Sequence, residues 1–333
     1  MTPDTALFRR DLLGTVGQLA RVDQFAVTGG PAHGTRVLRL VNGGGLEVEL
    51  HADRALDLGR VTYRGRAFAW LSPAGFAAPA LADPHEEGWL RTFGGGLLAT
   101  CGLDSFGDPS TTADGTRYPQ HGRIGALPAH LLRAEVTDEQ VIVQAEVRQA
   151  ALHGEHLRLH RTVRSPLGSH SLTLTDVVTN ESAVPQPHMV LYHVNLGWPL
   201  LGPRTVLVSP ATHVEPENDA ARASGQPWNA LHEPAPDAGS LVYLHRPPDT
   251  QEHWTVSATN PDNAMRLDLT ASHRSLPFLH TWTSLRPKQY VVGLEPANAP
   301  LMSGRAEAEA RGLVPLLAPH ASVRYDLRFE LDA

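Results

Sequence analysis

One stretch of the chain, Pro187–Leu201, indicates both its fold class and its candidate site; it reads PHMVLYHVNLGWPLL. In a β-strand, successive side chains point to opposite faces of the sheet. One face then carries apolar and aromatic side chains, those of Val190, Tyr192, Val194 and Leu196. The other face carries Leu191, His193, Asn195 and Gly197.

The polar face of this strand has two interpretations. An imidazole at 193 and a carboxamide at 195 can converge on one small polar ligand, with Gly197 leaving room beside them. Solvated His and Asn side chains on a half-buried strand would give the same pattern. The other stretches of the chain favour a site.

The composition favours many short strands over long helices. The 333 residues include 29 glycines and 27 prolines, spread along the whole length, and both residue types interrupt regular structure. Hydrophobic residues make up 41 %, enough for a large core. No change of composition marks a boundary, so we expect one all-β domain over residues 1–333.

Charge and cysteine content exclude several classes of protein. The net charge of −7, with Lys288 as the only lysine, argues against a nucleic-acid partner. No apolar run is long enough for a membrane span, and the first residues lack the apolar core of a secretory signal. The single cysteine, Cys101, excludes an internal disulfide and suits a reducing compartment. We therefore expect a cytoplasmic protein; its oligomeric state is not indicated.

Alternation of apolar and polar residues predicts the strands. Four segments separated by short breaks predict consecutive antiparallel strands, at 141–149, 156–165, 171–180 and 188–197. Further strands are predicted within 35–66 and at 241–245, 253–260, 265–270, 278–284, 290–296 and 322–332.

Three other segments depart from this pattern. Residues 5–25 have apolar residues at helical spacing and predict an N-terminal helix, although Gly14 and Gly17 weaken it. Residues 303–312 favour a short helix. Residues 210–240 are rich in Pro, Ala and Asn, which is typical of a long surface loop.

The second informative stretch is Tyr290–Pro300, which reads YVVGLEPANAP. In a strand, Gly293 and Glu295 share a face, and Pro296 ends the strand at its rim. A carboxylate beside a missing side chain can act as a general base with space for a substrate. An ordinary solvated glutamate at the end of a strand is the alternative.

Three shorter motifs supply candidate ligand contacts, each with a structural alternative. In DRALDLG, Arg54 and Asp57 can form a local ion pair, or Arg54 can donate to a hydroxyl. In HGRI, His121 and Arg123 would share a face if the segment is a strand. In FLHTWTS, Trp282 beside His280 can stack on a sugar ring or pack in the core.

The histidines do not predict a metal site. His153, His156 and His160 have helical spacing, but the leucines and arginines between them alternate as in a solvated strand. HExxH and CxxC motifs are absent, as are a GxSxG elbow and a Walker sequence. We expect neither a metal nor a nucleotide cofactor.

Together these motifs resemble the galactose mutarotase (aldose 1-epimerase) superfamily. Within it, the similarity is greatest to a bacterial branch of aldose 1-epimerase-like proteins (DUF4432). The matching stretches occur in order as DRALDLG, GGLLATCGL, HGRI, YHVNLGWPLL and GLEPANAP, between residues 53 and 300. The aspartate that binds sugar hydroxyls in true mutarotases has no counterpart among them.

The resemblance implies a β-supersandwich of two large antiparallel sheets with a sugar bound in an open cleft. It places the acid on His193 and the base on Glu295. Sugar-binding roles then fall on Arg54 and His121, with Arg123 beside the latter. Asp57, Asn195, His280 and Trp282 are further candidate substrate contacts from the strand patterns.

The expected reaction is the interconversion of sugar anomers by acid–base ring opening. A carboxylate and an imidazolium are sufficient for it near neutral pH, as Glu295 and His193 would be. A non-catalytic carbohydrate-binding or regulatory protein on the same fold is the main alternative, since fold does not fix function. A related sugar isomerase, or a polysaccharide lyase or hydrolase, would also use such a fold.

Overall fold

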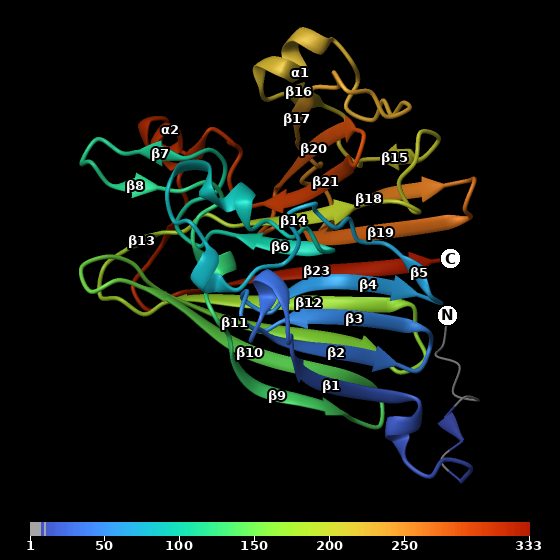
Figure 1. Cartoon of the computed structure of the whole chain (residues 1–333). Coiled ribbons are helices and arrows are strands. Elements are labelled where there is room, and N and C mark those ends of the chain that lie inside the picture. The colour runs from blue at the N-terminus through green and yellow to red at the C-terminus, as the bar shows by residue number, and fades with distance from the viewer. Residues whose placement is uncertain (1–7, 10) are drawn as a thin grey trace.

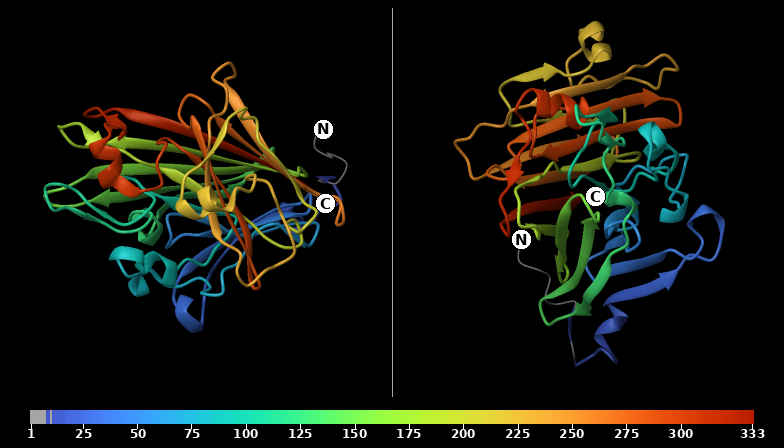
Figure 2. Two further views of the ribbon diagram at one scale, coloured as in Figure 1. Left: turned by 90° about the horizontal axis from the view of Figure 1, so that it is seen from above. Right: turned by 90° about the vertical axis from the view of Figure 1, so that its left-hand side faces the viewer.

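Alternating sequences become strands that bury one face, as in β10 (Gln140–Ala150) and β23 (Ser322–Asp332). The computed structural model describes residues 8, 9 and 11–333. The apolar faces of the strands meet in a core between two large antiparallel sheets. Figures 1 and 2 show these sheets from three directions. The all-β prediction is confirmed.

The larger sheet has eleven strands within the described residues. In spatial order they are β1 (Ala20–Ala26), β2 (Arg36–Asn42), β3 (Leu46–His51), β4 (Asp57–Tyr63), β6 (Leu98–Cys101), β14 (Leu191–Leu196), β21 (Gln289–Ala297), β20 (Phe278–Arg286), β17 (Ser240–His245) and β16 (Val214–Pro216), with β5 (Arg66–Ala67) paired to β4.

The second sheet has eight strands in the same part of the chain. Their order is β15 (Val206–Val208), β18 (His253–Asn260), β19 (Met265–Ser272), β23, β12 (Ser171–Asn180), β11 (His156–Pro166), β10 and β9 (His130–Val136). Two small sheets pair β13 (Gln186–Pro187) with β22 (Leu316–Leu317) and β7 (Ser110–Thr111) with β8 (Arg117–Tyr118).

The helices are short and lie outside the two sheets. They are α1 (Asp219–Ser224), α2 (Gly304–Ala310) and the 3-10 turns η2 (Val16–Gln18), η3 (Gly30–Ala32), η4 (Pro79–Leu81), η5 (Glu86–Arg91) and η6 (Ile124–Ala126). The helix predicted at 303–312 is confirmed as α2. Across the described residues, no helix has the length and apolar character needed to cross a membrane.

Several predictions of local structure are wrong. Strand β21 runs through Pro296 to Ala297, so Glu295 lies within the strand and not at its rim, and residues 210–240, predicted as a loop, contain β16 and α1. The expected helix over 5–25 is replaced, in its described part, by η2 and by β1, because residues 20–26 pair along their whole length with β2; residues 5–7 and 10 lie outside the described residues. The fourth of the consecutive strands, β14, does not pair with β12. Instead the chain crosses to the other sheet, where β14 is buried on both faces, and β23 takes the place beside β12.

A buried arginine joins the two sheets beneath β14. Arg161 on β11 is fully buried and donates to both oxygens of Asp176, at 2.9 and 2.7 Å. It also reaches across to the larger sheet, donating to Asp57 at 2.8 Å, to Thr100 at 2.7 Å and to the carbonyl of Ala55 at 3.1 Å. All five N–H donors of the guanidinium therefore have a partner.

The cost of breaking this network provides a test of its role. Replacing Arg161 by Met leaves two buried carboxylates without their cation, a change that typically costs about 3–5 kcal/mol. We expect Arg161→Met to lower the free energy of unfolding, measured in urea, by this amount. Arg164→Met is the matched control, because Arg164 lies on the same strand but is half-exposed. Equal losses in the two variants would contradict the role given to Arg161.

Candidate active site

Three neighbouring strands of the larger sheet place the predicted acid and base side by side. Strands β14, β21 and β20 are adjacent, and the β20–β21 register pairs His280 with Glu295. On the other side of β21, Val194 of β14 pairs with Leu294. With side chains alternating along each strand, His193, Glu295 and His280 point to the same face.

His193 and Glu295 meet in the middle of this face. Nε2 of His193 lies 3.2 Å from Oε1 of Glu295, and the two side chains are 5 % and 0 % exposed. The contact lacks the angles of a regular hydrogen bond. Neither carboxylate oxygen of Glu295 has a hydrogen-bond partner within the described chain, and neither has Nδ1 of His193. These atoms remain free to bond to a ligand.

Two glycines near the pair have different roles. A Cβ at position 293 would overlap Oε1 of Glu295 and lie 3.4 Å from the His193 ring, so Gly293 makes room for the Glu295 carboxylate itself and not, as the sequence suggested, for a substrate. Gly197 does not leave room beside His193. A Cβ there would come within 2.7 Å of Cα of Trp70, so this glycine permits close packing of two backbone segments.

Aromatic side chains surround His193 and form the walls of a cleft of about 490 Å³. The ring centroids of Phe93, Trp282 and Trp89 lie 5.2, 5.5 and 5.9 Å from that of His193. The ring of His121 lies 5.5 Å from it, on the same cleft. The structure thus brings together four predicted residues: His193, Glu295, His121 and Trp282.

His280 lies under the cleft and carries a positive charge. Its Nδ1 is 2.6 Å from Oε2 of Glu217, and its Nε2 is 3.1 Å from the carbonyl oxygen of Ala299. Both partners are acceptors, so both ring nitrogens must hold protons. Burial disfavours this charged form, but the Glu217 carboxylate outweighs burial and raises the pKa of His280. His280 is therefore not a direct substrate contact but a fixed cation beside Glu295.

Burial sets the protonation of the central pair. It raises the pKa of Glu295 to about 8, against the effect of the His280 charge, and lowers the pKa of His193 to about 4. Near neutral pH the pair holds one proton, on Glu295, and His193 is neutral. This is the reverse of the carboxylate and imidazolium expected from the sequence. Burial also lowers the pKa of His121 well below its usual range.

Two predicted substrate contacts belong to the scaffold instead. Asp57 accepts from the backbone N–H of Thr100 at 3.0 Å, from its hydroxyl at 2.6 Å and from Arg161, so it does not pair with Arg54. Asn195 is fully buried and donates to the carbonyl oxygens of Gly96 and His193.

Arg54 and Arg123 lie in a second cavity of about 260 Å³, outside the main cleft. HGRI is not a strand, because the backbone turns sharply at His121 and Gly122, with φ of 58° and 74°. His121 and Arg123 consequently line different cavities rather than one face.

Sequence reasoning missed Glu217, Trp89 and Phe93. Glu217 follows β16 within the segment predicted as a surface loop; besides His280, it accepts from the backbone N–H of Met302 at 2.5 Å. Trp89 in η5 stacks on Phe93 at 4.0 Å. Their spacing of four residues, beside a glycine-rich stretch, was the only local signal for these walls.

The histidine-rich segment follows its strand interpretation from His156 onward, whereas His153 lies in the turn between β10 and β11. His156 and His160 lie on β11, and His156 bonds to the carbonyl oxygen of Ala151 through Nε2. Over the described part of the chain, no three His, Cys, Asp or Glu side chains converge in a way that could hold a metal ion.

Comparison with solved structures supports the same architecture. A protein from Klebsiella pneumoniae provisionally named as an aldose 1-epimerase superposes with a TM-score of 0.85 at 27 % identity, over 93 % of this chain and 83 % of that one. A galactose mutarotase-like protein from Clostridium acetobutylicum gives 0.69 at 10 % identity, over 95 % and 99 %. One from Lactobacillus casei gives 0.59 at 13 %, over 89 % and 100 %. The last two show the fold alone.

Sequence families give the closer assignment. No functionally curated protein matches the chain. Residues 32–331 match the family described as a domain of unknown function, DUF4432. This match spans most of the chain, and the chain therefore belongs to the DUF4432 family and has the galactose mutarotase-like fold.

Proposed function

We propose that the protein is an isomerase that interconverts the anomers of a free sugar or sugar derivative, as an aldose 1-epimerase does. The observation that carries the proposal is the approach of His193 Nε2 to Glu295 Oε1, at 3.2 Å, in a cleft where both carboxylate oxygens lack a partner among the described residues. A free sugar has two oxygens, the C1 hydroxyl and the ring oxygen, with which such a pair can exchange protons.

The geometry suits the chemistry of ring opening. The base takes the proton of the C1 hydroxyl while the acid protonates the ring oxygen, and the bond between C1 and the ring oxygen breaks. The aldehyde then rotates about the C1–C2 bond, and the reverse proton transfers close the ring on its other face. Both oxygens are bonded to C1, so the acid and the base must lie within a few ångströms of each other.

The single proton of the pair is sufficient for this reaction. The family resemblance assigns the acid to His193 and the base to Glu295, whereas burial keeps the proton on Glu295. Transfer of that proton to His193 over their contact converts one arrangement into the other. The nearby His280 cation favours the Glu295 carboxylate and therefore supports the transfer.

The cleft walls suit a sugar ring. Trp89, Phe93 and Trp282 present aromatic surfaces on which the apolar face of a pyranose can stack. His121 and Glu217 supply polar groups at the edge of the same cleft. Few polar groups among apolar walls are typical of sites for small molecules.

Removing either member of the pair should abolish most of the rate. We expect Glu295→Gln and His193→Asn each to lower kcat by about 10²–10⁴-fold, because each removes one proton-transfer partner. NMR of freshly dissolved single anomers from a panel of aldoses measures the rate. Glu135→Gln and His130→Asn, exposed on β9, are matched controls. Turnover of the best substrate by Glu295→Gln at the wild-type rate would show that the mechanism is wrong.

The pH profile of kcat/KM should be bell-shaped, after subtraction of spontaneous mutarotation. Below a pH of about 4 activity falls because His193 is protonated as well, so that the pair holds two protons and has no base. Above a pH of about 8 it falls because Glu295 is deprotonated and the pair has no acid. We expect the alkaline limb to disappear in the residual activity of Glu295→Gln. A wild-type profile that stays flat from pH 6 to 10 would contradict a one-proton pair.

Folding stability tests the same protonation without a substrate. With a pKa of about 8 in the folded state against 4.5 for an ordinary glutamate, protonated Glu295 stabilises the fold fully below pH 4.5, and this contribution is lost as the pH rises to 8. Relative to Glu295→Gln, the wild type should lose about 1.4 kcal/mol per pH unit across this window. Urea unfolding at several pH values measures the difference, and Glu135→Gln should keep the wild-type slope.

A further inference from the structure

A second cavity of about 260 Å³ lies beside the main cleft and contains two arginines. Arg54 and Arg123 line it, and most of its remaining wall is Pro, Ala, Gly and Leu. Trp89 and Gln120 line both this cavity and the main cleft. The two spaces therefore meet at the same side chains.

Most N–H donors of the Arg54 guanidinium have no hydrogen-bond partner among the described residues. Within the described chain, the hydrogen bond of its guanidinium runs from Nη1 to the carbonyl oxygen of Ala77, at a long 3.3 Å. The carboxylates nearest in sequence bond to other groups: Asp53 to Arg36, and Asp57 to Arg161 and Thr100, so that Asp57 acts on Arg54 only through its charge. Burial lowers the pKa of Arg54, which means that its cation lacks adequate compensation. An unpaired cation in a partly buried site is costly unless an anion joins it.

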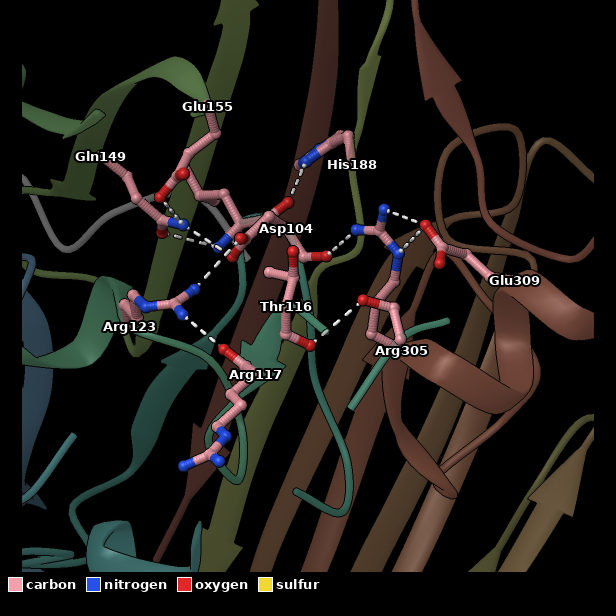
Figure 3. A network of polar contacts seen from close by, with 11 residues as sticks. Asp104, Thr116, Arg117, Arg123, Gln149, Glu155, His188, Arg305 and Glu309 are labelled. Atoms are coloured by element: carbon pink, nitrogen blue, oxygen red, sulfur yellow. Dashed lines mark hydrogen bonds and ion pairs between the residues drawn. The ribbon is translucent and has the colours of Figure 1, made fainter. Parts of the chain in front are cut away.

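Arg123 is held in place at the other side of the cavity. Its Nη1 donates to Oδ2 of Asp104 at 3.2 Å, and its Nη2 donates to the carbonyl oxygen of Arg117 at 2.8 Å (Figure 3). Asp104 is itself fixed by Nε2 of Gln149 at 2.6 Å. This network orients the guanidinium before any ligand binds.

The acidic group on the cavity wall is already engaged. Oδ1 of Asp83 accepts from the backbone N–H and from Nδ1 of His85, both at 3.1 Å. Among the described residues Asp83 forms no hydrogen bond or ion pair with Arg54, whose guanidinium keeps N–H donors without a partner.

The chain itself connects the two spaces. Gln120 lines both, and the left-handed turn at His121 and Gly122 then directs His121 to the cleft and Arg123 to the second cavity. A sugar ring stacked on Trp89 in the cleft would lie against a side chain that also lines the cavity of the two arginines. A substituent on the ring, remote from C1, can extend toward them.

We propose that the second cavity is an anion subsite, and that the preferred substrates are aldoses carrying a carboxylate or phosphate group remote from C1. Guanidinium groups bind both anions through paired hydrogen bonds. The substrate class rests on the proposed anomer interconversion, whereas the anion subsite is testable by binding alone.

Calorimetric titration of the full-length protein tests the subsite. Two matched series are used: glucose, glucuronate and glucose 6-phosphate, and galactose, galacturonate and galactose 6-phosphate. We expect one anionic sugar to bind about 10–100-fold more tightly than its neutral counterpart, the gain from a charge-assisted hydrogen bond, and this preference to shrink with added salt. Whether the carboxylate or the phosphate binds more tightly identifies the anion.

Variants assign the preference to the cavity. Arg54→Gln should remove most of the difference between the anionic and neutral sugars, and Arg54→Lys should keep part of it. Arg91→Gln is the matched control, because Arg91 is exposed in η5, next to the cavity but not lining it. When kcat and KM are measured for the same sugars, the loss of preference in Arg54→Gln should appear mainly as a change in KM.

The outcomes separate this inference from the proposed function. If neutral and anionic sugars bind alike, or if Arg54→Gln keeps the preference, the anion subsite is wrong, even where neutral aldoses are turned over. If anionic sugars bind more tightly through Arg54 but no anomer is interconverted, the subsite stands and the proposed reaction is wrong.

Discussion

The structure depends on the buried guanidinium of Arg161 between its two sheets. Apolar contacts between sheets tolerate small shifts, whereas five hydrogen bonds from one rigid group fix distance and angle together. Asp57 and Thr100 receive them on the larger sheet, and Asp176 receives them on the smaller one. Tyr192 joins the network by donating to Asp176 at 2.8 Å. This hydrogen bond fixes the core-facing side of strand β14.

This anchor positions the proposed acid–base pair. Tyr192 and His193 are consecutive, so fixing Tyr192 toward the core directs His193 to the opposite face, into the cleft. Ladder hydrogen bonds with β21 then bring Glu295 beside it, although 102 residues separate the two in sequence. A pair of ionisable groups excluded from water is tolerated here because it shares one proton and carries little net charge.

The sequence predicts what depends on neighbours along the chain. Alternation located most strands and placed His193 and Glu295 on polar faces, but it could not show that the space above Gly293 is filled by the Glu295 carboxylate itself. It could not show that β14 leaves its preceding strand for the other sheet, because pairing is decided by packing over long distances. For the same reason Glu217 looked like a loop residue, and Arg54 like part of the cleft. Motif similarity supplied the pairing of the acid with the base, while the register of β20, β21 and β14 supplied their contact.

The division between strands and loops around the cleft has a consequence for how such a protein can diversify. The proposed acid–base pair lies on two central strands, whereas Trp89 comes from η5, Glu217 from the segment after β16, and Met302 from the turn before α2. Loops accept substitutions and insertions that a central strand does not. Exchanging these three segments between relatives would remodel the shape and charge of the walls while His193 and Glu295 stay in register. On the proposed function, one unchanged scaffold would then accept sugars with different substituents, with the loops deciding which of them bind.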